Sequence, residues 1–241
     1  MDRCDFLPVS AEEMHERGWW WYDALVVGGD AYVDHPSFGT AVISRVLEAE
    51  GLRVAVLAQP DWHDAEAFRA MGRPRLGVFI GAGNLDSMVA HYTAAKRRRS
   101  EDFYSPGKRT GCRPDRAAIV YCNRAREAFG PDVPIILGSL EASLRRFAHY
   151  DYWDDSVRRA ILFDAPADLL VYGMGEAATI EIAHRLKKKQ SVHTMTDIPG
   201  TGYITRDPSV CKFDHITLPS FEDVRDDKRL YAEATRTEYA E

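Results

Sequence analysis

Side chains able to bind a ligand are concentrated in short turns that directly follow apolar runs. The longest such turn, GGDAYVDHPSFG, contains Asp30, His35, Ser37 and Gly39. Carboxylate, imidazole and hydroxyl groups can hold a polar ligand, and an imidazole can also ligate a metal. The alternative interpretation is structural, because the Asp and Ser side chains of this turn are also good N-terminal caps for a helix.

Three further turns carry polar side chains in the same position. Asn84 lies in GAGNLD, Glu141 and Arg145 lie in GSLEASLRR, and Glu176 lies in GMGE. The guanidinium of Arg145 could pair with an anion. Glu176 is equally explained by the preference for carboxylates in the first turn of a helix. No catalytic or metal-ligating residue is assigned, and the candidate ligand-binding residues are Asp30, His35, Ser37, Gly39, Asn84, Glu141, Arg145 and Glu176.

The segments between these turns alternate between strand and helix patterns. Short apolar runs, typical of parallel strands buried on both faces, occur at 24–27, 54–58, 76–80, 134–137 and 167–172. Segments with helical patterns occur at 39–50, 61–70, 87–99, 115–129, 140–148, 156–162 and 176–189. This alternation predicts an α/β fold with a doubly wound, mostly parallel, five-stranded, Rossmann-like sheet.

The predicted α/β domain spans residues 23–190. Because parallel strands end at the same edge of a sheet, the turns described above converge on one rim, where ligands bind in such folds. An N-terminal extension at 1–22 precedes the domain. An irregular C-terminal extension at 191–241 follows it, with a hairpin or irregular strands predicted at 192–206 and a charged helix at 220–239 that looks cut rather than finished.

Two aromatic strings allow two interpretations each. Trp19–Tyr22 could stack on a nucleobase, but aromatic side chains more often fill a core edge, and we favour packing. The string HYDYWD at 149–154 could line a cleft or pack its rings under a loop. Ahead of the first string, Ser10 and Glu13 have the spacing of a capping box that opens a short helix.

One region concentrates positive charge. Lys96–Arg99 end the predicted helix at 87–99, where cations complement the helix dipole, and Lys108, Arg109 and Arg113 follow. Such a region could bind the phosphates of a nucleotide or of RNA. Because charge runs usually face water, we favour a solvated loop.

Composition narrows the class of protein. At 241 residues, 45% apolar and 28% charged, the chain is typical of globular domains. Its net charge of −6 argues against a nucleic-acid surface over the whole protein but leaves a local basic patch open. No apolar run approaches the roughly 20 residues that span a bilayer. We therefore expect no membrane partner and a cytoplasmic protein. A hydrolase is not supported, because Gly-x-Ser-x-Gly and His-Glu-x-x-His motifs are absent.

The cysteines indicate structural thiols. Cys4, Cys112, Cys122 and Cys211 are widely spread and include no Cys-x-x-Cys pair. This spacing matches no zinc site, and disulfides are unexpected in the cytoplasm.

Several long runs resemble one known family. GDAYVDHPSFG, VAVLAQPDWH, GNLDSMVAHYTA, VPIILGSLEASLRRFAHYDYW and LLVYGMGE are similar to the N-terminal region of YgiQ-type radical SAM proteins, long catalogued as uncharacterised. The similarity covers about residues 20–205, and PSFEDVRDDKRLYAEATR is similar to the linker that follows in that family.

The resemblance implies a Rossmann-like domain, similar to cobalamin-binding domains, ahead of a catalytic barrel. In the full-length family that barrel holds a [4Fe-4S] cluster on a Cys-x-x-x-Cys-x-x-Cys motif and cleaves S-adenosylmethionine reductively. The motif is absent from this sequence, so the cluster and S-adenosylmethionine are implied for the full-length family and not for this chain. The chain thus resembles a fragment whose partner is the absent barrel.

Cobalamin itself is not supported by the residues. The family of base-off cobalamin sites uses Asp-x-His-x-x-Gly, whereas Asp34 and His35 are adjacent here and Gly39 lies four residues beyond His35. A histidine that caps a helix or touches a polar substrate fits this spacing better.

Two hypotheses follow. The first is an accessory domain that presents an unknown substrate to a radical SAM barrel. The second, from a different class, is a free-standing module that binds a nucleotide or corrinoid.

Overall fold

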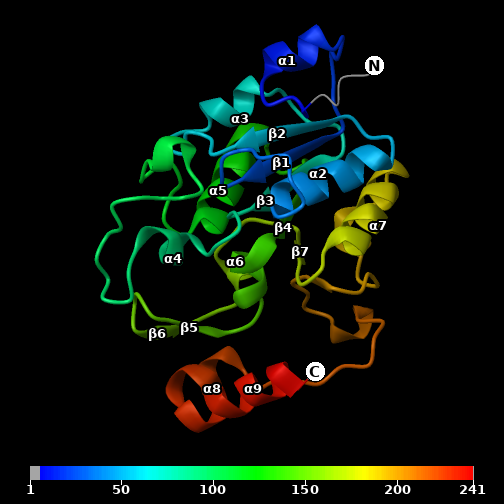
Figure 1. Cartoon of the computed structure of the whole chain (residues 1–241). Coiled ribbons are helices and arrows are strands. Elements are labelled where there is room, and N and C mark those ends of the chain that lie inside the picture. Colours follow the sequence, from blue (N-terminus) through cyan, green and yellow to red (C-terminus); the bar gives the residue numbers. More distant parts are fainter. Residues whose placement is uncertain (1–5, 241) are drawn as a thin grey trace.

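A six-stranded sheet with helices on both faces forms the centre of the molecule (Figure 1). The computed structural model describes residues 6–240. The strand order is β2-β1-β3-β4-β7-β8, and the first five strands are parallel. These five strands are β1 (Ala24–Gly28), β2 (Val54–Ala58), β3 (Gly77–Gly81), β4 (Ile135–Gly138) and β7 (Leu169–Val171). The predicted doubly wound, mostly parallel α/β fold is confirmed.

Alternate residues along the strands build two separate cores, as the two-residue period of a strand requires. Val26 and Phe79 belong to the core on one face, whereas Leu25 and Ile80 belong to the core on the other. The helices that contribute to these cores are α2 (Gly39–Ala49) and α7 (Glu176–Lys187) on the first face and α3 (Glu66–Ala70) and α5 (Ala117–Phe129) on the second. Burial of both faces explains why the strands read as continuous apolar runs.

The remaining elements are short or peripheral. They are α1 (Ala11–Glu16), α4 (Ser87–His91), α6 (Ser139–Leu144), β5 (His149–Asp151), β6 (Ser156–Arg158), β8 (Thr201–Gly202), α8 (Phe221–Asp226), α9 (Lys228–Ala240) and the 3-10 turns η1 (Pro106–Lys108), η2 (Ile161–Phe163), η3 (Val192–Thr194) and η4 (Pro208–Val210). In the part of the chain that the structure describes, no helix is long and apolar enough to cross a membrane.

The predicted helix at 87–99 is wrong beyond its first turns. Helix α4 ends at His91, and Tyr92 then pairs with Arg98 in an isolated β-bridge. The Arg99 N–H donates to the carbonyl of His91 at 2.7 Å, so the chain folds back on itself. Lys96 and its neighbours therefore lie in a turn and not at the C-terminus of a helix.

Three other segments differ from their predicted secondary structure. Residues 156–158 form β6, in which Val157 lies opposite Tyr150 of β5, because a β-branched and an aromatic side chain pair well across antiparallel strands. Of the hairpin or irregular strands expected at 192–206, the structure has one two-residue strand, β8, which pairs antiparallel with β7 and becomes the sixth strand. The expected C-terminal helix is broken into α8 and α9 at Asp227, whose backbone is extended.

The N-terminal extension packs on the sheet. Ser10 caps α1, and its Oγ accepts from the Glu13 N–H at 3.2 Å, as the capping box predicts. Tyr22 is buried, and Trp21 lies between the guanidinium groups of Arg53 and Arg75, 4.0 and 3.5 Å from its ring centroid. The packing interpretation of this aromatic run holds for these two rings.

Both edges of the sheet are occupied. At one edge the Pro8 carbonyl accepts from the Val56 N–H of β2 at 2.9 Å. At the other edge the two residues of β8 pair with β7. Below the sheet in Figure 1, α9 contacts the β5–β6 hairpin, where the Tyr231 hydroxyl accepts from the Tyr150 N–H at 3.0 Å.

Candidate functional site

A cleft of about 270 Å³ lies at the carboxyl edge of the sheet, between the N-terminal ends of α2 and α7. Its walls are mainly apolar, with Val42 and Ile43 from α2 and Phe79 and Ile136 from the sheet. Among the residues that the structure describes, Glu176 is the only ionisable one that lines it. Strand order reverses between β1 and β3, so the cleft occupies the switch point at which open α/β sheets bind ligands.

Glycines at the ends of the strands allow neighbouring backbone and side chains to approach closely. Gly28, Gly81 and Gly138 end β1, β3 and β4 at the same level of the sheet. A Cβ atom at Gly28 would lie 2.6 Å from the Thr40 Oγ1 atom, and one at Gly29 would lie 1.9 Å from a backbone carbonyl oxygen. Only glycine permits such close approach, so α2 can begin directly against the end of β1.

Asn84 connects the turn after β1 to the start of α2. Its Oδ1 accepts from the Gly39 N–H at 3.3 Å, and its Nδ2 donates to the Ser37 carbonyl at 2.8 Å. The N-cap residue, Phe38, makes no side-chain cap, so the capping role considered for the Asp and Ser residues of this turn is not seen in α2. The amide of Asn84 takes over part of that role from a different turn.

His35 is exposed and lies apart from any carboxylate partner in the residues described. Its Nδ1 accepts from the Ser37 N–H at 3.1 Å. The neighbouring Asp34 is ion-paired with Arg45 of α2. A metal-ligating imidazole is normally oriented by a hydrogen bond from its other ring nitrogen, and Asp34 does not provide that support. His35 and its neighbours therefore do not suit the role of axial cobalt ligand in a base-off cobalamin site.

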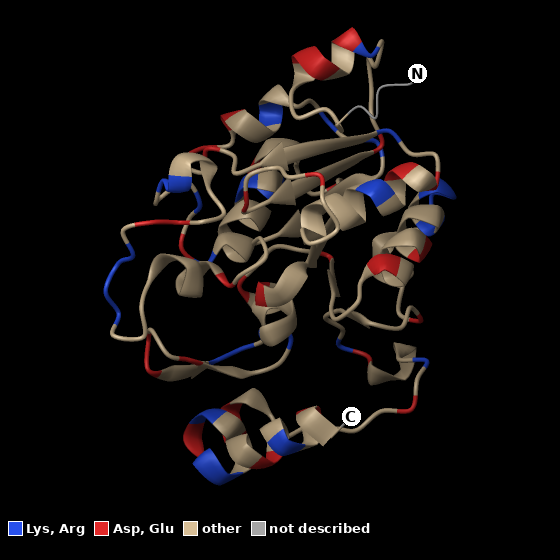
Figure 2. Ribbon diagram, in the orientation of Figure 1, with Lys and Arg blue, Asp and Glu red and all other residues tan. Residues whose placement is uncertain are grey.

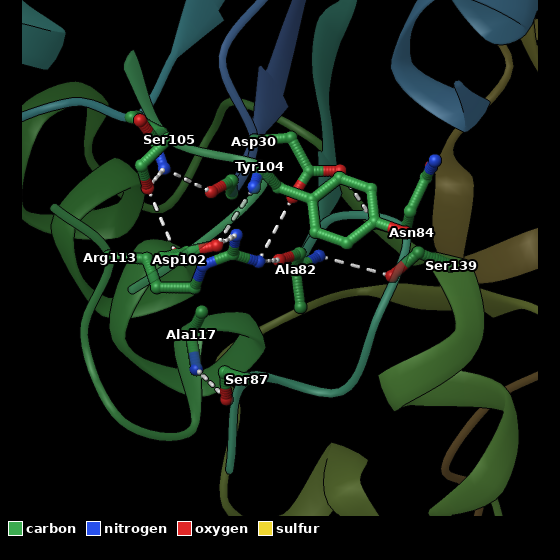
Figure 3. A network of polar contacts seen from close by, with 12 residues as sticks. Asp30, Ala82, Asn84, Ser87, Asp102, Tyr104, Ser105, Arg113, Ala117 and Ser139 are labelled. Atoms are coloured by element: carbon green, nitrogen blue, oxygen red, sulfur yellow. Dashed lines mark hydrogen bonds and ion pairs between the residues drawn. The ribbon is translucent and has the colours of Figure 1, made fainter. Parts of the chain in front are cut away.

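Asp30 belongs to a buried ion network rather than to the surface of the cleft (Figure 3). The Nη1 atom of Arg113 lies 3.0 Å from Asp30 Oδ1. The same guanidinium donates through Nε and Nη2 to the two carboxylate oxygens of Asp102, each at 3.1 Å. The side chains of all three residues are at most 3% exposed. Arg113 was predicted to belong to a solvated loop, and that prediction is wrong.

The network fixes the turn after β1. Asp30 Oδ2 accepts from the Asn84 N–H at 2.7 Å, and the Ala31 N–H donates to the Tyr104 carbonyl at 2.8 Å. Burial raises the pKa of Asp30 above its usual range, against the opposing effect of the Arg113 charge. One guanidinium therefore serves two carboxylates, and the site positions the backbone that leads to the cleft.

Glu141 is a second buried positioning residue. Its Oε2 accepts from the Ser87 N–H at 2.8 Å, and its Oε1 accepts from the Ala118 N–H at 3.0 Å. It thereby ties α6 to the first turns of α4 and α5. Burial, together with the nearby charge of Asp86, raises the pKa of Glu141.

Arg145 also binds residues at the starts of α4 and α6. Its Nη1 is ion-paired with Asp86, which caps α4 by accepting from the Met88 N–H at 2.9 Å. The Arg145 guanidinium also donates to the Glu141 carbonyl at 3.3 Å. Binding of an anion by Arg145 would have to share or break its ion pair with Asp86.

The eight candidate residues thus fall into three groups. Only Gly39 and Glu176 line the cleft itself. The first group lies around the turn after β1 and the start of α2 and consists of Asp30, His35, Ser37, Gly39 and Asn84. The second group, Glu141 with Arg145, holds α4, α5 and α6 together. The last group is Glu176, which begins α7 on the cleft wall.

Sequence analysis missed the hydroxyl groups of the cleft. Thr40, Ser139 and Thr179 line it together with the residues above. Ser139 has a φ of 74°, which is uncommon for a residue with a side chain, and its Oγ accepts from the Ala82 N–H at 3.0 Å. Its place directly after a strand was the available signal, since ligand-facing residues of such sheets follow strand ends.

No set of three or more His, Cys, Asp or Glu residues that could hold a metal ion is present between residues 6 and 240. Cys112, Cys122 and Cys211 are free thiols, and Cys4 lies outside the described residues. The residues described therefore do not fit a [4Fe-4S] cluster.

Comparison with known proteins gives a consistent family. Residues 6–241 match the family described as Radical SAM N-terminal. A UPF0313 protein of Clostridium botulinum (strain 657 / Type Ba4) is 54% identical over the whole chain, and one of Clostridium perfringens (strain SM101 / Type A) is 52% identical. The chain spans 37% and 36% of the length of these two relatives.

One solved structure is also similar. The radical S-adenosylmethionine methyltransferase TsrM from Kitasatospora setae, solved with cobalamin and a [4Fe-4S] cluster bound, matches 76% of this chain and 27% of its own. The TM-score is 0.49 at 20% sequence identity.

Proposed function

The chain belongs to the Radical SAM N-terminal family, and on this premise we propose that it presents a substrate to a radical SAM barrel carried elsewhere on a longer polypeptide. Its relatives are about 2.7 times as long as the chain, since the chain spans only 37% of them. The α/β unit at 23–190 would be the presenting domain, with 1–22 and 191–241 as its extensions. The cleft between α2 and α7 would hold the substrate.

The observation that carries this proposal is an apolar rim at the carboxyl edge of the sheet. Leu140 and Leu144 of α6 are 44% and 55% exposed, and Val89 of α4 is 53% exposed. Met174, which lines the cleft, is 86% exposed. Several exposed apolar side chains on one edge are typical of a surface that another domain covers. They follow the same strands as the cleft, so a domain bound there would face the ligand.

The cluster and S-adenosylmethionine that the resemblance implies would be bound by the barrel. The barrel would supply reductive cleavage of S-adenosylmethionine, whereas this chain would bind and orient the substrate. Glu176 and the hydroxyl groups of Thr40, Ser139 and Thr179 are the groups able to bind a polar part of that substrate. The apolar walls would hold the rest and exclude water.

Hydrogen exchange tests the contact between the domains. Amides of residues 139–145 and 173–176 are expected to exchange more slowly in the full-length gene product than in the 241-residue chain. Leu144→Asp should remove that difference. Trp20→Ser is the matched control, because Trp20 is 80% exposed on the N-terminal extension, away from the rim. Equal exchange of the rim in both proteins would exclude the proposed contact.

A free-standing binding module is the second candidate, and the form of the cleft favours it. The cleft has a backbone floor at Gly81 and Gly138, one carboxylate and mostly apolar walls, which suit a flat group such as the base of a nucleotide. A corrinoid bound there would not use His35 as an axial ligand, for the reasons given above.

We also propose a cytoplasmic location. The three described cysteines are free, as expected in a reducing compartment.

A further inference from the structure

A tight turn after α4 presents consecutive cations in a defined arrangement. The Lys96 N–H donates to the Thr93 carbonyl at 2.9 Å, and the Thr93 N–H donates to the Arg97 carbonyl at 2.9 Å. Tyr92 and Arg98 form the β-bridge that closes the turn. These bonds fix the backbone, so the charges of the turn are held close together and are not the frayed end of a helix.

The protein offsets the positive charge of this turn only in part, through the electrostatic interaction of Arg98 with the carboxylate of Asp115. Lys96–Arg99 are all exposed, and none of them forms an ion pair with another described residue. Residues 92–113 carry seven Lys and Arg but only two acidic residues, and one of those, Asp102, is buried against Arg113. A strongly positive loop therefore projects from a chain whose net charge is −6 (Figure 2).

Aromatic rings lie beside these cations. Tyr152, next to β5, is 49% exposed, and its hydroxyl donates to the Ala94 carbonyl at 2.7 Å. The Lys96 Nζ atom lies 4.8 Å from the centroid of the Tyr152 ring. Tyr92 and Trp153 pack against each other with centroids 4.8 Å apart. The basic turn and the aromatic string, which are far apart in the sequence, thus form one surface.

We propose that this surface binds a single-stranded nucleic acid. Lys96, Arg97 and Arg98 would contact successive phosphates, and an unpaired base would stack on Tyr152. Proteins that bind single-stranded nucleic acids combine cations placed along the sugar-phosphate backbone with exposed aromatic rings on which the bases stack. Exposed rings distinguish this surface from one that only attracts acidic proteins. The proposal is independent of the cleft and of the cluster.

The test is fluorescence anisotropy with the full-length gene product and labelled oligo(U) or oligo(dT) of about 12 nucleotides, within the usual size of single-stranded sites. The triple variant Lys96→Gln, Arg97→Gln, Arg98→Gln should bind at least about tenfold more weakly. Its slope of log K against log salt should fall by about two, since each phosphate contact on a single strand contributes about 0.7. Tyr152→Ala should weaken binding about fivefold or more, the effect of one lost stacking contact, and leave the salt slope unchanged.

The matched control is Lys187→Gln, Lys188→Gln, Lys189→Gln. It removes the same charge from three exposed lysines at the end of α7, at the opposite edge of the sheet. The control should bind as the wild type does. Equal weakening in both triple variants, or no binding of either oligonucleotide at low salt, would overturn the proposal. Preference for oligo(U) or for oligo(dT) identifies the type of strand.

Discussion

The guanidinium of Arg113 lies 3.0 Å from the carboxylate of Asp30, and both side chains are buried. The two residues come from different connections of the sheet, and Asp102 completes the network on the other side of Arg113. Removal of one member leaves a buried charge without compensation, which is far more costly than loss of a surface ion pair.

Arg113→Met is therefore expected to destabilise the protein by about 3–5 kcal/mol. Urea unfolding followed by circular dichroism measures this difference. Arg109→Met is the control, because Arg109 is exposed in the same loop and its loss should change the free energy of unfolding by less than about 0.5 kcal/mol. Similar stabilities of the two variants would show that the buried network does not hold the turn after β1.

Glu141→Ala should destabilise the fold by about 1–3 kcal/mol for each backbone N–H that it leaves without an acceptor. Two such groups, from Ser87 and Ala118, are involved. Glu141→Gln keeps the shape and one acceptor, so its cost should be smaller. Unfolding of both variants in urea at pH 7 gives the comparison, and equal losses would argue against the assigned hydrogen bonds.

The stability contributed by Glu141 should also depend on pH. Burial raises its pKa in the folded state above the ordinary value of 4.5, so the folded protein favours the protonated form. The contribution is complete below pH 4.5 and is lost as pH rises through the higher folded-state pKa. The stability difference between wild type and Glu141→Gln should therefore shrink from pH 4 towards pH 8. A difference that grows over this range would show that the pKa is lowered instead.

Gly39→Leu should close the cleft without unfolding the protein. A Cβ atom at Gly39 would meet nothing within 4 Å, and its φ is outside the left-handed region. Gly39 is the first residue of α2, so its replacement should stabilise the helix by less than the roughly 1 kcal/mol found in helix interiors. We expect an unchanged or higher melting temperature together with at least a tenfold loss of ligand binding or substrate turnover in the full-length protein. Unaltered turnover would place the ligand elsewhere.

Hydroxocobalamin distinguishes the second candidate function. If a corrinoid occupies the cleft, titration followed by absorbance should show binding that Gly39→Leu abolishes and that His35→Ala changes less than about twofold. The reason is that Asp34 pairs with Arg45 and leaves the imidazole without a carboxylate to orient it. A loss of binding specific to His35→Ala would show that the histidine ligates cobalt after all.

The parallel sheet was predictable because strands buried on both faces need continuous apolar residues. The end of α4 was not. Ala94, Ala95, Lys96 and Arg97 are all good helix formers, yet the bridge between Tyr92 and Arg98 overrides their preference. The turn is also held by contacts of Ala94 and Lys96 with Tyr152 and Trp153, and such distant partners leave no mark on local sequence.

The sequence predicted that the turns meet at the carboxyl edge of the sheet, where the structure has the cleft, but it did not predict the contacts of their side chains. Arg113 looked like one more cation of a basic loop, because its partner Asp30 lies 83 positions earlier in the chain. Glu141 similarly binds backbone groups of two distant helices. Pattern and spacing give the position of a strand end, whereas the partner of a charged side chain depends on the folded connections.

The covered edges of the sheet restrict how this molecule can associate. The chain beside Pro8 occupies the outer side of β2, and β8 offers only two residues beyond β7. Short or covered edge strands give a foreign strand little backbone to pair with. Amyloid-like addition of a strand to either edge of the six-stranded sheet is thereby disfavoured.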